Sequence, residues 1–109
     1  MSRTIPESDW KVFRRLADLA LERFCARVLA DISKIIEADN DQTSHERYQA
    51  IYGLIHERDK KLAMAFDDVS RSMAIQQLAV ICRYQLLTDE EMSQFSGETR
   101  AAVSSLMSL

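Results

Sequence analysis

The segment of residues 73–87, MAIQQLAVICRYQLL, constrains the fold more than any other part of the chain. Wound as an α-helix, it carries apolar side chains on nearly every side: Val80 and Tyr84 lie on one face, while Ile81 and Leu86 point elsewhere. A helix that is apolar all round has to be enclosed by other helices, either from its own chain or from a second copy. The sequence therefore predicts a helical protein built around this segment.

A narrower apolar stripe leads into this segment. Its members recur at the spacing of one helix face: Tyr48, Ile51, Tyr52, Ile55, Leu62, Phe66, Val69 and Met73. The stripe keeps its phase through Asp59 and through the pair Asp67 and Asp68, which a kinked or restarted helix would usually reset. We therefore predict one helix over residues 44–87, about 65 Å long, with a break at residues 67–72 as the alternative.

The first helix is predicted to run for about 30 residues and to end before Ala38. Thr4 and Glu7 have the spacing of a capping box, and Pro6 is tolerated in a first turn. One apolar stripe follows: Trp10, Phe13, Ala17, Ala20, Leu21, Phe24, Val28, Ile32 and Ile35. A second, shorter strip lies almost opposite and needs another element to cover it. It consists of Val12, Leu16 and Leu19.

A polar loop at residues 38–44 separates the two long helices. Its Asp, Asn, Thr and Ser side chains bond to their own backbone and compete with helix formation. Thr43 and Glu46 have the spacing of a capping box, which marks the start of the second helix. Two antiparallel helices about this loop would bring together residues whose numbers sum to about 83.

Two short helices are predicted after the long ones. Thr88 and Glu91 form another capping box, with acidic residues at the positive end of the helix dipole. Ser96 and Gly97 end this helix, and residues 98–107 form the last amphipathic one. We expect both short helices to fold back over the end of the hairpin.

The predicted fold is all-α, with residues 1–109 as a single helical domain: a long antiparallel helical hairpin with two short C-terminal helices folding back. Two helices alone make a thin core at the loop end. The apolar side chains there are Ile32, Ile35, Ile36, Tyr48, Ile51, Tyr52 and Ile55. We therefore expect two hairpins to pair as a homodimer and form a helical bundle that buries these side chains. The alternative contact is the apolar surface of Ile75, Leu78, Ala79 and Cys82.

Composition favours a soluble cytoplasmic protein. The chain is 47% hydrophobic with two Gly and one Pro, which argues against disorder and against a turn-rich β fold. The N-terminal sequence MSRTIPESDW lacks the apolar region of a signal peptide, and the longest uncharged segment, residues 72–82, is well short of the roughly 20 residues of a membrane span. Cys25 and Cys82 lie in apolar helical sequence without a CxxC pair and are predicted to be reduced, buried thiols.

The tripeptide His-Glu-Arg occurs at residues 45–47 and again at residues 56–58. This step of 11 residues is close to three helical turns, so His45 and His56 would lie on one side of the helix, about 16 Å apart. They are too distant to share a metal ion within one chain, and we interpret them as part of a solvated charged face. A metal site between subunits is the alternative.

Two acidic clusters could be considered as acid/base groups: Asp67 with Asp68, and Asp89 with Glu90 and Glu91. Each has a structural explanation in solvation or helix capping, and neither accompanies a nucleophile or a Gly-rich phosphate loop. We therefore predict no catalytic, cofactor-binding or metal-binding residues, no cofactor and no enzymatic activity.

Polar side chains within the apolar segment have a structural interpretation as well. Gln76 and Gln77 are expected to make a core or interface hydrogen bond that fixes helix register, with ligand binding as the alternative.

The first helix has a basic bias, which supports an alternative function. Its basic residues are Lys11, Arg14, Arg15, Arg23 and Arg27. The formal net charge of −3 and the acids at residues 89–91 argue against binding to nucleic acid. The leading hypothesis is a non-enzymatic helical module for protein–protein interaction or regulation, whose partner is a second copy or another protein. The alternative is a nucleic-acid-associated factor that uses the basic first helix, and a third is a small-ligand or metal-binding protein. We expect no membrane association.

Overall fold

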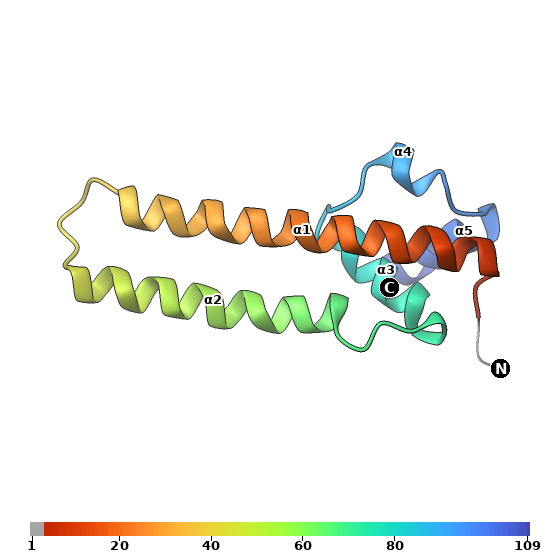
Figure 1. The fold of residues 1–109 in the computed structure, drawn as a ribbon, viewed down its shortest axis with the longest axis horizontal. Coiled ribbons are helices and arrows are strands. Elements are labelled where there is room, and N and C mark those ends of the chain that lie inside the picture. Colours follow the sequence, from red (N-terminus) through yellow and green to blue (C-terminus); the bar gives the residue numbers. More distant parts are fainter. Residues whose placement is uncertain (1–3) are drawn as a thin grey trace.

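The computed structural model describes residues 4–109 and confirms the all-α fold. Two long helices, α1 (Glu7–Glu37) and α2 (Ser44–Phe66), lie side by side and antiparallel (Figure 1). The remaining helices gather at the end of the hairpin opposite the loop, and no strand occurs in the described part of the chain. The first three residues of the predicted 1–109 domain lie outside the described residues.

The prediction of one helix over residues 44–87 is wrong, and the alternative break is what occurs. Asp67 follows the last residue of α2 in an extended conformation, and Asp68 has a positive φ of 51°. Ser70 then caps a short 3₁₀ helix, η1 (Arg71–Met73), by accepting a hydrogen bond from the backbone N–H of Met73. Asp and Ser side chains favour such turns because they bond to nearby backbone groups. This local preference overrides the continuous apolar stripe.

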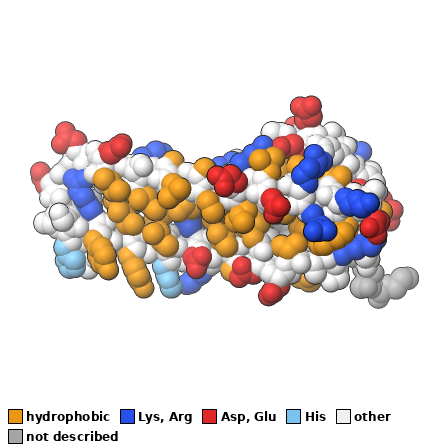
Figure 2. Space-filling view, viewed as in Figure 1, with side chains coloured by type: hydrophobic (Ala, Val, Ile, Leu, Met, Phe, Trp, Pro, Cys, Tyr) orange, Lys and Arg blue, Asp and Glu red, His pale blue; other side chains and the backbone are white. Residues whose placement is uncertain are grey.

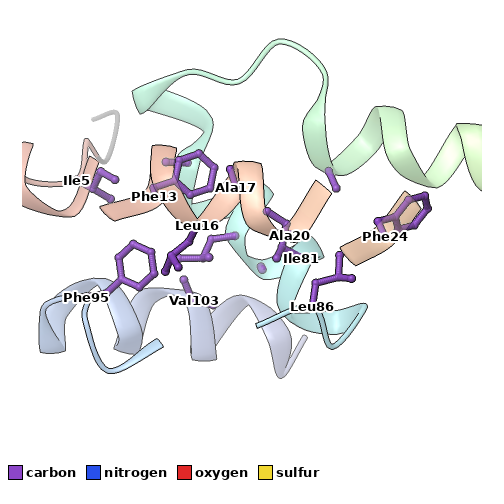
Figure 3. Packing of buried hydrophobic residues seen from close by; sticks show 14 residues of the cluster. Ile5, Phe13, Leu16, Ala17, Ala20, Phe24, Ile81, Leu86, Phe95 and Val103 are labelled. Atoms are coloured by element: carbon purple, nitrogen blue, oxygen red, sulfur yellow. The ribbon is translucent and has the colours of Figure 1, made fainter. Parts of the chain in front are cut away.

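The break lets α3 (Ala74–Arg83) turn back toward the hairpin instead of extending beyond it (Figure 1). Leu78 and Ile81 are fully buried, and Ala74 and Ala79 are buried with them. Figure 3 shows Ile81 and Leu86 packing toward α1. The all-round apolar segment is therefore enclosed by its own chain, as the periodicity requires.

α3 ends in a Schellman motif. The N–H of Gln85 donates to the carbonyl of Cys82, and the N–H of Leu86 donates to the carbonyl of Ile81. Gln85 adopts the left-handed conformation that this motif needs, with φ of 56°. Leu86 and Ile81 are both buried, which is the apolar contact that usually accompanies the motif.

Two of the three predicted capping boxes are confirmed. The hydroxyls of Thr43 and Thr88 each accept a hydrogen bond from the backbone N–H three residues later. In return, the backbone N–H of each threonine donates to the carboxylate of Glu46 or Glu91. The third is wrong, because α1 begins after Pro6 and has no side-chain cap. Pro itself fits the N-cap because it has no N–H to leave unsatisfied.

The two short helices, α4 (Asp89–Met92) and α5 (Gly97–Met107), cover the second strip of α1 as predicted. Leu16 is buried where α5 meets α1, close to Phe95 and Val103 (Figure 3). Leu19, further along the same strip, remains 38% exposed. The short helices therefore cover only the first part of this strip.

The pairing of α1 with α2 differs from the expected one, in which the numbers of neighbouring residues sum to 83. The helices are shifted along each other by about two helical turns. Phe24 lies against Phe66 with ring centroids 6.2 Å apart, and Asp31 binds Arg58 at 2.8 Å, pairs whose residue numbers sum to 90 and 89. The displacement arises at the loop, because α2 begins beyond the last turn of α1 (Figure 1).

Candidate interaction surface

One face of the hairpin presents two stripes of mostly apolar residues, which together we call the hairpin face. Its residues are Cys25, Leu29, Ile32 and Ile36 from α1, and Tyr48, Tyr52, Ile55 and Asp59 from α2. In each stripe the residues are spaced by four, three and four positions, the spacing of residues that pack between helices in a bundle. The stripes lie on the same side of the molecule, because Leu29, Ile32 and Ile55 line a common groove.

The hairpin face is exposed to solvent although it is apolar. The exposed fractions are 68% for Tyr48, 65% for Tyr52, 63% for Leu29, 58% for Ile36 and 47% for Ile55. Figure 2 shows hydrophobic side chains gathered over α1 and α2 toward the loop end. Single exposed apolar residues are common on proteins, but a contiguous apolar patch is unusual on a monomeric protein and is typical of interaction surfaces.

A groove of about 280 Å³ runs between the two helices at the inner end of this face. Phe24, Val28 and Leu62 line its floor and sides together with residues of the hairpin face. Arg58 and Asp59 are the charged residues at its edge, and Arg58 is already bound to Asp31. The groove is therefore an apolar slot with a single remaining carboxylate at the rim.

The sequence of α2 is depleted in charge where the face is most exposed. Residues 48–55, YQAIYGLI, contain no charged side chain, although Tyr48, Gln49 and Ala50 are all exposed. Gly53 is also exposed, and a Cβ placed there would meet no atom within 4 Å. Nothing among residues 4–109 explains a glycine in the middle of this helix, where it costs roughly 0.5–1 kcal/mol relative to Ala.

The hairpin that carries this face is held by specific contacts. Arg47 donates from its guanidinium to the carbonyls of Ile36 at 2.7 Å and Ala38 at 2.9 Å, the otherwise unpaired acceptors at the end of α1. The Asp31–Arg58 ion pair ties the two helices together near their middle. These contacts make the face a preformed platform.

Arg23 and Arg27, which the sequence offered for nucleic acid, are bound within the molecule. Arg23 forms a bidentate pair with Glu91, at 2.7 and 2.9 Å, and also donates to the carbonyl of Leu86. Arg27 donates to the carbonyls of Tyr84 and Gln85 at the end of α3. Both guanidinium groups therefore satisfy backbone carbonyls at the C-cap of the enclosed helix and in the turn that follows it.

The other basic residues of α1 lie together. Arg15 bonds to the side chain of Gln94, whereas Lys11 and Arg14 make no polar side-chain contact within residues 4–109. All three line a second groove, of about 450 Å³, to which Asp18 also contributes its side chain. The basic bias of the first helix thus reduces to this short stretch.

Glu91 joins two structural roles that the sequence showed only in part. The hydrogen bonds from Arg23, together with the backbone N–H of Thr88, lower the pKa of Glu91 to about 2. The capping box was visible in the sequence, but the ion pair with a residue 68 positions away was not. The residue is therefore fixed as a carboxylate that joins α4 to α1.

Asp9 is a buried carboxylate that the sequence analysis missed. Its oxygens accept hydrogen bonds from the N–H of Ser96 at 2.9 Å, from its hydroxyl at 2.6 Å, and from the hydroxyl of Thr99 at 2.6 Å. Burial raises the pKa of Asp9, but these hydrogen bonds more than offset it, so the pKa lies below its ordinary value. A signal was present, because Asp9 precedes Phe13 by four residues and Leu16 by seven and so lies on their buried face.

The two histidines are exposed, as the interpretation of a solvated face expects. The imidazole of His56 stacks on the ring of Tyr52, with centroids 6.1 Å apart and planes within 6°. Within residues 4–109, no group of three His, Cys, Asp or Glu side chains is placed to hold a metal ion. His56 therefore borders the hairpin face as an aromatic neighbour of Tyr52.

The prediction that both cysteines are buried is wrong. Cys25 and Cys82 are thiols of intermediate exposure. Cys25 lines the groove of the hairpin face, where no third helix covers it. Cys82 contacts the sulfur of Met92, and burial raises the pKa of its thiol.

The prediction for the two glutamines holds for one of them. Gln77 is buried and donates from Nε2 to the carbonyl of Asp67 at 2.9 Å, which fixes the turn between α2 and α3. Its Oε1 has no hydrogen-bond partner among the described residues. Gln76 is exposed.

The two acidic clusters occupy exposed positions, one in a turn and one at the start of a helix. Asp67 and Asp68 form the exposed turn after α2, and Asp89 and Glu90 occupy the exposed first turn of α4. Both locations match the structural explanations given by the sequence.

No helix within residues 4–109 combines the length and the apolar character needed to cross a membrane. Comparison of the chain with protein-family models, with curated proteins and with solved structures finds no match.

Proposed function

We propose that this protein is a non-enzymatic interaction module that binds a helical protein segment on the hairpin face. The observation that carries the proposal is the exposure of Leu29, Tyr48 and Tyr52 on two parallel stripes with bundle spacing. Fully burying a side chain of this size is worth roughly 1.5–3 kcal/mol relative to exposure. Covering the face would therefore supply a large share of a binding free energy.

The shape of the face favours a helix as the bound element. Two antiparallel helices leave a shallow groove between them, and side chains spaced by three and four positions on a third helix fit such a groove. The groove between α1 and α2 is lined mostly by apolar side chains, including Val28, Ile32 and Leu62. An extended strand would find no open sheet edge here, since the platform is helical.

The titratable groups with the clearest structural partners support a non-catalytic role. Asp9 and Glu91 have lowered pKa values, and both are engaged in hydrogen bonds that join helices. Catalytic acids and bases are usually tuned toward neutral pH instead. We also propose a cytoplasmic location, which the free thiols of Cys25 and Cys82 support.

Site-specific photo-crosslinking in cells tests the proposed function. A benzophenone side chain at position 52 should form a covalent adduct with a protein, because Tyr52 is central to the hairpin face. The same group at Glu57 is the matched control, since helical periodicity places position 57 on the opposite side of α2, where it is exposed. Equal labelling at both positions, or none at position 52, would contradict the proposed function.

A further inference from the structure

We propose that the helical partner on the hairpin face is a second copy of this chain, so that two hairpins form an antiparallel four-helix bundle. This inference rests on the proposed function of the face and names its occupant. It commits to a two-fold dimer in which the two loops point in opposite directions and the C-terminal helices remain outside the contact.

The spacing of the hairpin face is self-complementary. A two-fold contact requires that residue i meets residue j while j meets i. The spacing of four, three and four reads the same in both directions, so an axis between Tyr52 and Ile55 places Tyr52 of each copy against Ile55 of the other. The axis crosses both helices of a hairpin at the same level and so meets α1 near Ile36, because residues side by side in the hairpin have numbers that sum to about 89 or 90. Ile36 therefore meets Ile36 of the second copy, and Leu29 faces the loop end of the other hairpin.

The polar groups of the face are complementary under the same operation. Asp59 is the one charged member of the two stripes, and a carboxylate moved into an interface needs a hydrogen-bond donor. The two-fold axis brings it opposite Tyr48 of the second copy, whose phenolic hydroxyl is a donor. The opposite pairing occurs at the other end, so both carboxylates would be satisfied.

The area of the face fits a dimer of this size. The five most exposed side chains of the face together present on the order of 500 Å². The half-buried Cys25 and Ile32, the groove residue Leu62 and the uncharged position Gln49 surround them. With that rim the patch approaches the roughly 800 Å² per partner of a standard interface.

The missing charges agree with this arrangement. Residues 48–55 carry no charged side chain to repel a second copy. A solvated surface helix would ordinarily carry charges at such positions.

Sedimentation equilibrium of the full chain tests the inference. At about 10 to 200 µM protein, we expect a mass twice the 12.5 kDa of the chain. Tyr52→Lys places a charge at the centre of the contact and should weaken self-association by at least about 100-fold. Glu57→Lys introduces the same residue on the opposite side of α2 and should leave the dimer unchanged.

A second variant, on α1, tests whether the loss of self-association is specific to the substitution at Tyr52. Leu29→Lys should also give a monomer, and circular dichroism should show unchanged helix content for both variants, since these side chains make little contact in the single chain. A dimer that persists in both variants would overturn the assignment to this face.

A wild-type monomer at the highest concentration would overturn self-association. In that case the crosslink at position 52 separates the two proposals. An adduct with a different protein would leave the proposed function in place with another partner, and the absence of any adduct would overturn both.

Discussion

The carboxylate of Asp9, in the first turn of α1, accepts a hydrogen bond of 2.6 Å from the hydroxyl of Thr99, which lies 90 residues later in α5. Ser96, the N-cap of α5, donates twice to the same carboxylate. The two ends of the chain are therefore joined through one buried anion at the start of a helix, where negative charge is favoured.

Replacing this anion should destabilise the fold. Asp9→Asn keeps the size of the side chain but turns one acceptor into a donor that faces Ser96 and Thr99, so we expect a loss of about 2 to 4 kcal/mol in the free energy of unfolding. Urea denaturation followed by circular dichroism would measure it. Asp18→Asn, the same change at an exposed position of α1, should alter stability by less than about 0.5 kcal/mol. Equal stability of the two variants would contradict the structural role of Asp9.

Stability should fall in acid through Glu91. Its pKa is lowered from an ordinary value of 4.5 to about 2 in the folded protein by the bonds from Arg23 and Thr88. A carboxylate with a lowered folded pKa contributes stability that is fully present above its unfolded pKa and is lost as the pH falls toward the folded value. The loss should therefore occur between about pH 4.5 and 2. In Glu91→Gln the melting temperature should depend less on pH over this range, and an unchanged pH profile would argue against the ion pair.

Gln85 should be the position where glycine helps most. Its φ of 56° is unfavourable for a residue with a side chain, and the Schellman motif at the end of α3 prefers glycine there. We expect Gln85→Gly to stabilise the protein by about 0.5 to 1 kcal/mol in thermal unfolding. Gln76→Gly, in the exposed interior of α3, should instead destabilise it by about 1 kcal/mol. A loss of stability in the first variant would show that its side chain contributes more than its backbone strain costs.

At position 53, by contrast, removing the glycine should stabilise the protein. A methyl group at this position meets nothing within 4 Å, so Gly53→Ala should stabilise α2 by about 0.5 to 1 kcal/mol through its higher helix propensity. Thermal unfolding at a protein concentration low enough to keep the chain monomeric isolates this effect. A destabilised monomer would mean that Gly53 has a role within the chain.

Much of the fold follows from local signals in the sequence. The capping boxes of Thr43 and Thr88 and the all-round apolar character of α3 identified helix starts and the enclosed element correctly. The break after Phe66 was harder, because the apolar stripe continues in phase across it and only the turn preference of Asp68 and Ser70 opposes it.

The long-range contacts could not be predicted in the same way. Arg23 and Arg27 look like surface cations in the sequence, since nothing local shows that they reach the end of α3 and Glu91. The exposed hairpin face, by contrast, was foreseen: two helices have too little surface to cover Tyr48, Tyr52 and Ile55. Periodicity shows which side chains need cover, whereas side-chain pairing depends on the tertiary arrangement.

The most direct measurement of the central claim is a comparison of ¹⁵N–¹H correlation spectra at about 20 and 500 µM protein. If the hairpin face is the contact between two copies, the backbone amides of residues 29–36 and 48–55 should shift with concentration, while those of Leu78 and Val103 in the buried core should not. Concentration-independent spectra, or shifts confined to the C-terminal helices, would contradict it.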